Sequence, residues 1–221
     1  MTPGPTLIKK CTYCSALICE HTALSWNSFG ATFWTDGWAY GRMMVPHLML
    51  IRCNQCESLV WRDEMEIVRE YDSLREPKDV KLPAYDFMNQ PSFNEYMAYL
   101  KKFGAKPDKE RYVRQNALWM GNHLRRIDVN LFSAGVWDKV VVNVDSPLTQ
   151  GEIENLEIFL KLLDASDEIQ RLSKADGLRQ LGRFSDSLRL LEKPPSGPMT
   201  AAHKVIENLA QSSDSMVAKI E

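Results

Sequence analysis

The 221-residue sequence has few cysteines, no marked excess of either charge and no long apolar run. Its formal net charge of −2 gives no general attraction to nucleic acid or to an anionic membrane. The longest apolar stretch, MMVPHLMLI, is too short to cross a bilayer, and the first residues have no apolar core of a signal peptide. We therefore expect a cytoplasmic protein with no membrane partner.

Short motifs of common enzyme sites are also missing. The sequence has no H-E-x-x-H, no glycine-rich phosphate loop, no nucleophile elbow, and no His-x-Glu followed by the C-x-x-C of a base deaminase. With 44% hydrophobic and 25% charged residues, the composition is nevertheless that of an ordinary globular protein. We therefore expect a folded protein that is not an enzyme.

Four of the five cysteines form two C-x-x-C pairs, in KKCTYC and RCNQC. A reducing compartment and an odd number of cysteines both disfavour a disulfide framework. Two residues between cysteines let a tight turn present both thiolates to one ion, and two such turns complete a tetrahedral site. We therefore predict one zinc ion, which is structural because four protein ligands leave no position for water. The predicted ligands are Cys11, Cys14, Cys53 and Cys56.

Other interpretations of this region remain open. A redox dithiol needs a reactive pair at the start of a helix, and neither pair precedes a helical pattern. Cys19 and His21 are close enough in sequence to compete as ligands, although a small buried side chain is the simpler interpretation of Cys19. Three basic residues stand beside the ligands, where they could offset the negative charge of a four-thiolate site: Lys9, Lys10 and Arg52.

Residues 1–62 are expected to form a zinc ribbon with an inserted hairpin. The Asp36-Gly37 pair is a type I′ turn signal between runs rich in Phe, Trp, Thr and Tyr. The segments LMLIRC and SLVWRD are predicted as strands on either side of the second cysteine pair. The metal would then replace a core that so short a β segment could hardly build.

Helical spacing begins beyond this region. Residues 63–91 are predicted as a connector, in which RDEMEIVREYDSL is weakly helical and REPKDVKLPAYDFMNQP is interrupted by proline. GVWDKVVVNVDSP, at 135–147, is a candidate short buried strand, although so short an apolar run fits a helix as well. The sequence indicates helix starts by capping residues or proline at Ser92, Pro107, Thr149 and Asp167.

The strongest charge asymmetry lies at residues 101–126, where eight Lys and Arg residues face only Asp108 and Glu110. Either these side chains pair with acidic helices of the same fold, or they bind an acidic partner or a phosphate backbone. In a nucleic-acid-binding protein, Trp34 or Trp38 would provide stacking surfaces. The candidate partner-binding residues are Arg111, Arg114, Arg125 and Arg126.

The segment RLSKADGLRQLGRFSDSLRLLEKPP has the order of a tetratricopeptide helix-turn-helix unit. Gly182 would end the first helix in the left-handed conformation, and Phe184 would pack the pair. Residues 200–211 and 213–221 are predicted as a following helix pair. A generic helical bundle that uses the same leucines is the alternative. The expected fold class is α+β, with a zinc-ribbon β domain followed by a mainly α-helical, tetratricopeptide-like region over residues 92–221.

In outline, nearly the whole chain resembles a bacterial family of uncharacterised function. That family combines cysteine knuckles around a segment like SWNSFGATFWTDGWAYGRMMVP, an aromatic residue after the second knuckle as in CNQCESLVW, and a helical unit like LRQLGRFSDSLRLLE. The resemblance implies zinc at the four paired cysteines and helical-repeat packing around Gly182 and Phe184, and it implies no reaction. Both knuckles lack the glycine that often follows the second cysteine, with Ser15 and Glu57 in its place.

Two functions of different classes follow from these patterns. The first is a zinc-binding protein-interaction module, an adaptor or inhibitor in a bacterial assembly that holds a protein partner. The alternative is a nucleic-acid-binding zinc-ribbon protein that uses its basic helical face. The modest net charge favours the first function.

Overall fold

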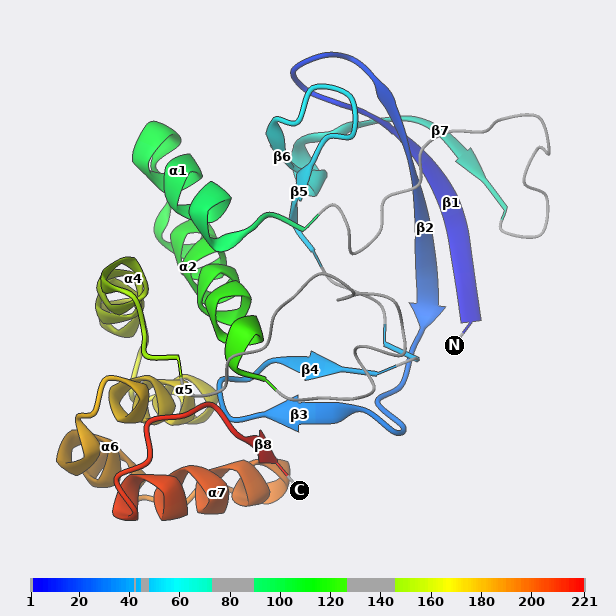
Figure 1. Ribbon diagram of the computed structural model, residues 1–221. Helices are drawn as coiled ribbons and strands as arrows, with labels where there is room; N and C mark the ends of the chain where they lie inside the picture. Colours follow the sequence, from blue (N-terminus) through cyan, green and yellow to red (C-terminus); the bar gives the residue numbers. More distant parts are fainter. Residues whose placement is uncertain (1, 42, 45–47, 73–89, 127–145, 221) are drawn as a thin grey trace. The chain divides into compact units, whose positions relative to one another are not determined.

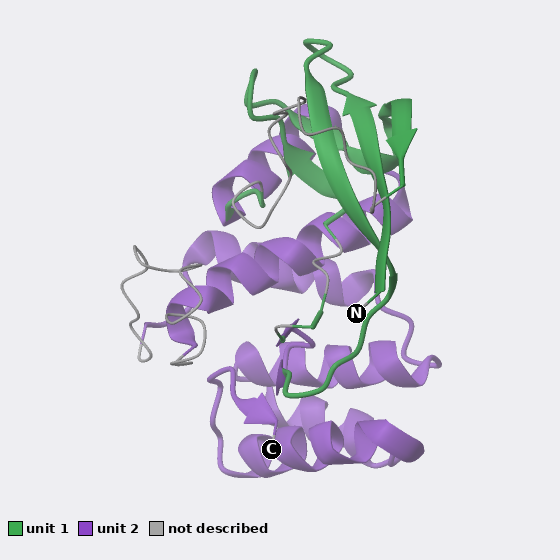
Figure 2. Ribbon diagram, turned by 90° about the vertical axis from the view of Figure 1, so that its right-hand side faces the viewer, with its two compact units in different colours: residues 1–31, 41–92 green, residues 32–40, 93–221 purple. Residues whose placement is uncertain are grey.

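The computed structural model describes residues 2–41, 43–44, 48–72, 90–126 and 146–220. The fold is α+β, with small antiparallel sheets followed by helices, as the sequence predicts (Figure 1). The chain divides into two compact units (Figure 2). The first unit contains residues 1–31 and 41–92, and the second contains residues 32–40 and 93–221.

The first unit is built on a three-stranded antiparallel sheet within the described residues. Its strand order is β2 (Leu17–Ser25), β1 (Thr2–Lys10) and β7 (Glu66–Tyr71). A hairpin of β5 (Leu50–Arg52) and β6 (Leu59–Trp61) encloses the second cysteine pair, as predicted, and the short 3-10 helix η1 (Arg62–Glu64) follows it. One buried apolar cluster of this unit contains Ile18, Leu48, Ile51, Val60 and Met65 together with Cys11 and Cys53.

In the segment predicted to be weakly helical, residues 62–64 form the 3-10 helix η1, but Glu66–Tyr71 form the strand β7, which pairs antiparallel with β1. Five of its six residues are exposed, including Ile67 and Val68. In a sequence, a half-buried strand is recognised by alternating apolar and polar residues. β7 has no buried face, so its sequence lacks this alternation. Its conformation is set by hydrogen bonding to the free edge of β1, which local spacing does not encode.

The second unit includes the predicted hairpin at residues 32–40 rather than leaving it in the ribbon. The strands β3 (Thr32–Trp34) and β4 (Ala39–Tyr40) are antiparallel, so the hairpin itself is confirmed. Its turn differs from the predicted type I′, because Gly37 has a positive φ of 82° while Asp36 does not. The hairpin lies with the helices because Trp34 and Trp38 pack against Val217 and Trp119.

The last described residues complete a three-stranded sheet in this unit. The strand β8 (Lys219–Ile220) pairs with the second edge of β3, and the order is β4, β3, β8. The helix predicted over residues 213–221 is therefore wrong. The buried side chain of Val217 packs on the two hairpin tryptophans, and this contact favours an extended chain over the weak local helical pattern.

The other elements described in the second unit are helices. α1 (Phe93–Phe103), α2 (Pro107–Asn122) and the 3-10 helix η3 (His123–Arg125) come first, and α4 (Gln150–Lys161) and α5 (Glu168–Gln180) follow. α6 (Phe184–Leu191), the 3-10 helix η4 (Gly197–Met199) and α7 (Thr200–Gln211) complete the series. Each described α-helix is in contact with the next described one along the sequence, in the order α1, α2, α4, α5, α6 and α7. Within the described part of the chain, no helix is long and apolar enough to span a membrane.

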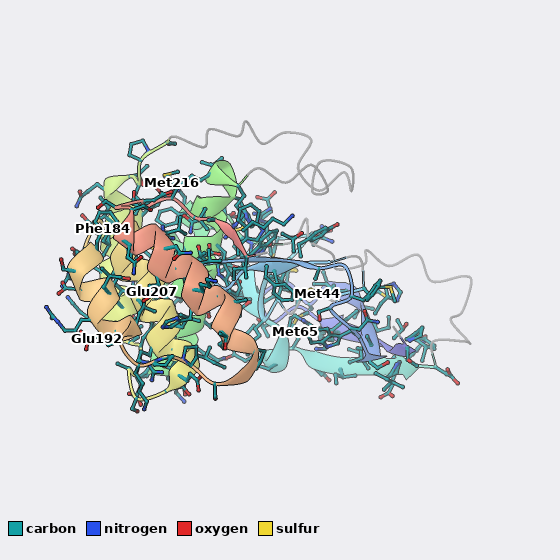
Figure 3. The ribbon with its side chains drawn as sticks, turned by 90° about the horizontal axis from the view of Figure 1, so that it is seen from below. Met44, Met65, Phe184, Glu192, Glu207 and Met216 are labelled. Carbon is teal, nitrogen blue, oxygen red and sulfur yellow. The ribbon has the colours of Figure 1, made fainter. Side chains whose placement is uncertain are left out.

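Local signals place these helices correctly. Thr149 and Glu152 form the predicted capping box of α4, and Asp167 caps α5 by accepting a 2.8 Å hydrogen bond from the Gln170 N–H. Gly182, with φ of 72°, ends α5 in the left-handed conformation as predicted. Phe184 is the first residue of α6, and Glu207 lies on α7 (Figure 3). The candidate strand at 135–147 and the middle of the predicted connector, 73–89, fall outside the described residues apart from 146 and 147.

Candidate metal centre

Both cysteine pairs occupy turns with the same hydrogen-bonding pattern. In the first, the Ser15 N–H donates to the Cys11 carbonyl at 3.0 Å, and the Cys11 N–H donates to the Ala16 carbonyl at 2.8 Å. In the second turn, the Glu57 N–H donates to the Cys53 carbonyl at 2.9 Å. There the Cys53 N–H donates to the Ser58 carbonyl at 3.0 Å. The sequence repeat C-x-x-C is therefore also a structural repeat.

The residue after each second cysteine takes the conformation that usually calls for glycine. Ser15 has φ of 62° and Glu57 has φ of 58°. A left-handed conformation costs a residue with a side chain about 1–2 kcal/mol. The missing glycines noted in the sequence therefore do not prevent the turns from forming. The same positive φ in both turns shows that the two cysteine pairs share this local backbone conformation.

The four thiols converge on one point. All four sulfur atoms lie within 4.8 Å of one another, with 3.9 Å between Cys11 and Cys56 and 3.7 Å between Cys14 and Cys53. Four thiolates about 2.3 Å from a tetrahedrally bound zinc ion lie about 3.8 Å apart, so the four residues fit such an ion. These separations are far longer than a disulfide bond of about 2.05 Å. The fold thus brings the four predicted ligands together as a candidate metal site.

Backbone groups and burial set the electrostatics of this site. The Tyr13 N–H lies 3.5 Å from the Cys11 sulfur, and the Gln55 N–H lies 3.5 Å from the Cys53 sulfur. Burial raises the pKa of the Cys53 thiol to about 12, whereas hydrogen bonds from Ser58 lower the pKa of the Cys56 thiol to about 6. A cation that binds all four sulfurs must therefore displace the proton of Cys53 at neutral pH.

The basic residues predicted beside the ligands have other partners. Lys9 forms a 2.8 Å ion pair with Glu20, which also pairs with Arg62. Lys10 lies 3.9 Å from Glu66. Burial opposes ionisation of Glu20, but its hydrogen bonds with Arg62 and Lys9 outweigh that effect and lower its pKa. Sequence reasoning missed this buried carboxylate, because no local pattern distinguishes it from a surface glutamate on a strand.

The two competing ligand candidates stand apart from the cluster. Cys19 and His21 lie two residues apart on β2, with 3.9 Å between the sulfur and Nε2 of the histidine. His21 Nδ1 is 3.3 Å from the Thr6 hydroxyl. Among the described residues, the group able to hold a metal ion contains Cys11, Cys14, Cys53 and Cys56 and neither of these two.

The basic helix α2 pairs its arginines within its own unit. Arg114 forms a 2.7 Å ion pair with Glu110 and a 3.3 Å hydrogen bond with Asn155 of α4. Arg111 donates to the Gln170 side chain of α5 at 3.0 Å. Of the two interpretations of the basic residues at 101–126, pairing within the same fold therefore applies to Arg111 and Arg114.

Two other partner-binding candidates are in the interior of the helical unit. Arg125 binds both carboxylate oxygens of Glu152, at 3.0 and 2.9 Å, and also donates to three backbone carbonyls. Arg126 pairs with Asp36 and lies 4.6 Å from the ring centre of Trp38. Both arginines are at most 5% exposed, so they do not form a surface for a partner. A buried charge is tolerated only when it is paired in this way.

The tryptophans proposed as stacking surfaces are likewise buried. Trp34 is 3% exposed and Trp38 is 8% exposed, so bases cannot stack on them in this fold. His123 lies edge-on to Trp38, and burial together with the charge of Arg126 lowers its pKa well below the ordinary value of 6.5. This histidine is therefore a neutral packing residue at neutral pH.

Sequence reasoning also missed a buried polar network that surrounds these groups. The Asn122 amide donates to Asp36 at 2.8 Å and to Gln180 at 3.1 Å. Arg179 pairs with Asp176 at 2.7 Å within α5. The network connects the hairpin turn to α2 and α5 through side chains that are hardly exposed. Its members appear in the sequence as an ordinary turn residue and ordinary polar helix residues, so no local signal could have identified it.

We found no protein-family model, curated protein or solved structure that matches this chain. The resemblance to a bacterial family therefore rests on the sequence motifs. What the structure adds is a four-cysteine cluster suited to a metal ion and a helical C-terminal unit.

Proposed function

We propose that this protein is a zinc-binding protein-interaction module, an adaptor or inhibitor in a bacterial assembly, and that it is not an enzyme. The observation that carries the proposal is the cluster of four cysteine sulfur atoms, which all lie within 4.8 Å of one another. A tetrahedral set of thiolates suits zinc or an iron–sulfur centre, and the two C-x-x-C pairs are the spacing of a structural zinc site. Because Cys11, Cys14, Cys53 and Cys56 would occupy all four positions, zinc would stabilise the fold and leave no place for a reacting water.

The role of the metal follows from the small core around it. Cys11 and Cys53 belong to the apolar cluster of the first unit, while Cys14 is exposed. A bound ion would join the two turns and add a cross-link that a core of this size needs. The ribbon is then a rigid platform attached to a helical unit, which is an architecture suited to holding another protein.

The pairing of the candidate arginines within the fold favours a protein-interaction function over nucleic-acid binding. Arg114, Arg125 and Arg126 are paired with Glu110, Glu152 and Asp36, respectively. Neutralised side chains release no counterions from a phosphate backbone, and counterion release provides most of the affinity of non-specific nucleic-acid binding.

Affinity purification of the full chain from native cells, with nuclease treatment, tests this function. We expect a stoichiometric protein partner that remains bound after nuclease treatment, and negligible nucleic-acid binding at physiological salt. Charge reversal at Arg111 and Arg114 should leave any residual nucleic-acid binding unchanged. A submicromolar nucleic-acid complex with a steep salt dependence, flattened by those reversals and without a protein partner, would refute the proposal.

A further inference from the structure

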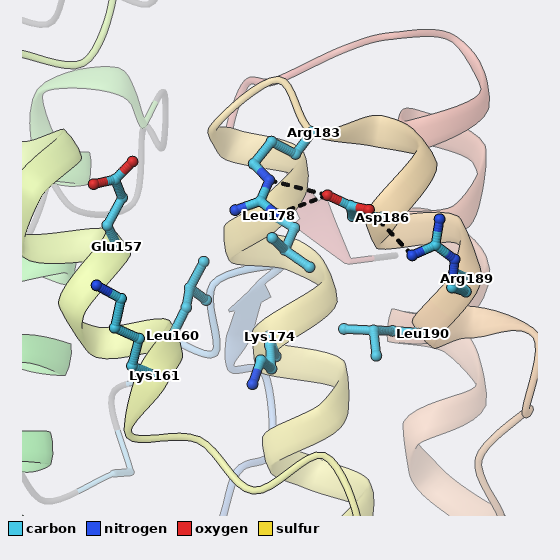
Figure 4. Close-up of a pocket in the computed structure, with 9 residues that line it drawn as sticks. All are labelled: Glu157, Leu160, Lys161, Lys174, Leu178, Arg183, Asp186, Arg189 and Leu190. Atoms are coloured by element: carbon cyan, nitrogen blue, oxygen red, sulfur yellow. Dashed lines mark hydrogen bonds and ion pairs between the residues drawn. The ribbon is translucent and has the colours of Figure 1, made fainter.

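A groove of about 430 Å³ lies among α4, α5 and α6 of the helical unit (Figure 4). Each of the three helices contributes one leucine to its lining, and charged side chains surround these leucines. The leucines are Leu160, Leu178 and Leu190. Leu160 and Leu178 belong to the core of the unit, so the bottom of the groove is a firm apolar surface rather than a loose loop.

The charges around the groove do not balance. Four lining residues are basic and two are acidic: Lys161, Lys174, Arg183 and Arg189 against Glu157 and Asp186. Asp186 forms ion pairs with two arginines, at 2.7 Å from Arg183 and 3.4 Å from Arg189. The ammonium group of Lys174 donates to the neutral Leu163 carbonyl at 3.3 Å and also interacts electrostatically with the Asp164 carboxylate. In the described part of the chain, the Lys161 ammonium has no hydrogen-bond or ion-pair partner.

These basic side chains are accessible, unlike those of α2 and η3. The side chains of Arg183 and Arg189 are 56% and 71% exposed, whereas that of Arg125 is 4% exposed. An exposed ion pair contributes at most about 1 kcal/mol, so a competing carboxylate can replace Asp186 at little cost. The groove therefore has an excess of positive charge beside an apolar surface, and both are available to a partner.

We propose that this groove binds an acidic segment of a partner protein, one that carries aliphatic side chains between its carboxylates. The aliphatic side chains would lie on the three leucines, and the carboxylates would bind Lys161, Lys174 and Arg189. The inference rests on the proposed interaction function, and it adds the surface and the chemistry of the partner. Charges at the rim would orient the segment and speed its association, while the apolar contact would slow its release.

A nucleic acid is a poorer occupant of the same groove. None of the nine residues that line it is aromatic, so bases have no surface on which to stack. Glu157 and Asp186 would repel the evenly spaced charges of a phosphate backbone. A peptide can place its carboxylates beside the lysines and its neutral residues beside these two acids.

Selection from a random peptide-display library on the full chain tests the inference. We expect the selected peptides to combine Asp or Glu with Leu, Ile or Val. The double variant K161E/K174E should bind these peptides about tenfold more weakly, as expected when two rim contacts become repulsive. K204E is the matched control, because Lys204 is an exposed lysine on α7 outside the groove, and it should bind like the unaltered protein.

A second variant keeps the test decisive. R189E alters a residue at the other side of the groove and should also weaken binding, and circular dichroism verifies that each variant retains its helix content. Selected peptides without acidic residues, or equal affinity in K161E/K174E, R189E and the unaltered protein, would overturn the inference.

The same variants separate this inference from the proposed function. If a cellular protein partner binds K161E/K174E and R189E as well as the unaltered chain, the groove is not its binding site while the interaction function stands. Acidic peptides that bind in the groove in the absence of any cellular protein partner would support the groove and count against the function.

Discussion

Arg126 forms an ion pair with Asp36 in the interior of the helical unit, although ninety residues separate them in the sequence. Neither side chain has any exposed surface. Asn122 donates a second hydrogen bond to Asp36, and the guanidinium of Arg126 lies over the ring of Trp38. The hairpin at residues 32–40 is thereby attached to the end of α2 by charge as well as by apolar packing.

Removal of one partner from this pair should be costly. R126M leaves Asp36 buried without its cation, and we expect the free energy of unfolding to fall by about 3–5 kcal/mol. Urea unfolding followed by circular dichroism measures the change. The control R189M removes an arginine that is 71% exposed, and it should cost less than about 1 kcal/mol.

The double variant D36N/R126M distinguishes a charge effect from lost packing. It has no uncompensated charge, so it should be more stable than R126M alone. Equal stability of the two variants would mean that packing, not the ion pair, accounts for the loss.

The metal centre predicts a specific pattern of zinc content. The unaltered protein, prepared without chelator, should contain one zinc ion per chain by elemental mass spectrometry. C53S should lose the ion and unfold the first unit while most of the helical signal remains, because Cys53 joins the apolar core to the site. C19S is the control and should keep its zinc, since Cys19 lies outside the cluster. Full zinc occupancy in C53S would disprove the assignment.

Stability of the helical unit should depend on pH through Glu152. Burial opposes ionisation of this carboxyl, but hydrogen bonds from Arg125 and Thr149 outweigh it and hold its pKa below the ordinary value of 4.5. Because the pKa is lower in the folded state, the stabilisation is complete above the ordinary value and is lost as the pH falls through the folded value. E152Q should therefore be less stable at neutral pH by roughly 3 kcal/mol and less sensitive to acid.

Urea unfolding at a series of pH values from about 7 to about 3 measures this effect. The series must begin above the pKa of Glu152 in the unfolded chain and continue downward toward its lower pKa in the folded protein. E154Q is the matched control, because Glu154 is an exposed residue of the same helix, and it should retain the pH dependence of the unaltered protein. Parallel stability curves for E152Q and the unaltered protein would contradict the role of Glu152.

Two glycines of the helical unit should respond to alanine in opposite directions. Gly182 has φ of 72°, which alanine adopts reluctantly, so G182A should destabilise the unit by about 1 kcal/mol. Gly151 lies in α4, and a Cβ there would meet the Phe93 ring at an ordinary 3.6 Å. G151A should be neutral or stabilising by up to about 1 kcal/mol. Thermal unfolding compares the two variants, and an equal loss of stability in G151A and G182A would contradict the role given to the positive φ of Gly182.

The amino-acid sequence by itself determined the features that depend on near neighbours. The C-x-x-C spacing is enough to form each cysteine turn, because its hydrogen bonds join residues no more than five apart. Thr149 and Asp167 cap helices through N–H groups three residues away, and Gly182 ends α5 through its own backbone freedom. Such signals are complete within one short segment, so they could be interpreted without a structure.

Only the tertiary structure decided which distant segments meet. β7 and β8 are strands because free edges of β1 and β3 accept them, and neither segment has a local pattern that shows this pairing. The same holds for Arg125 and Arg126, which a sequence presents as part of a basic face and the fold buries against Glu152 and Asp36. A side chain's charge is visible in the sequence, but whether it faces water or a counter-ion depends on residues that the chain brings together only when it folds.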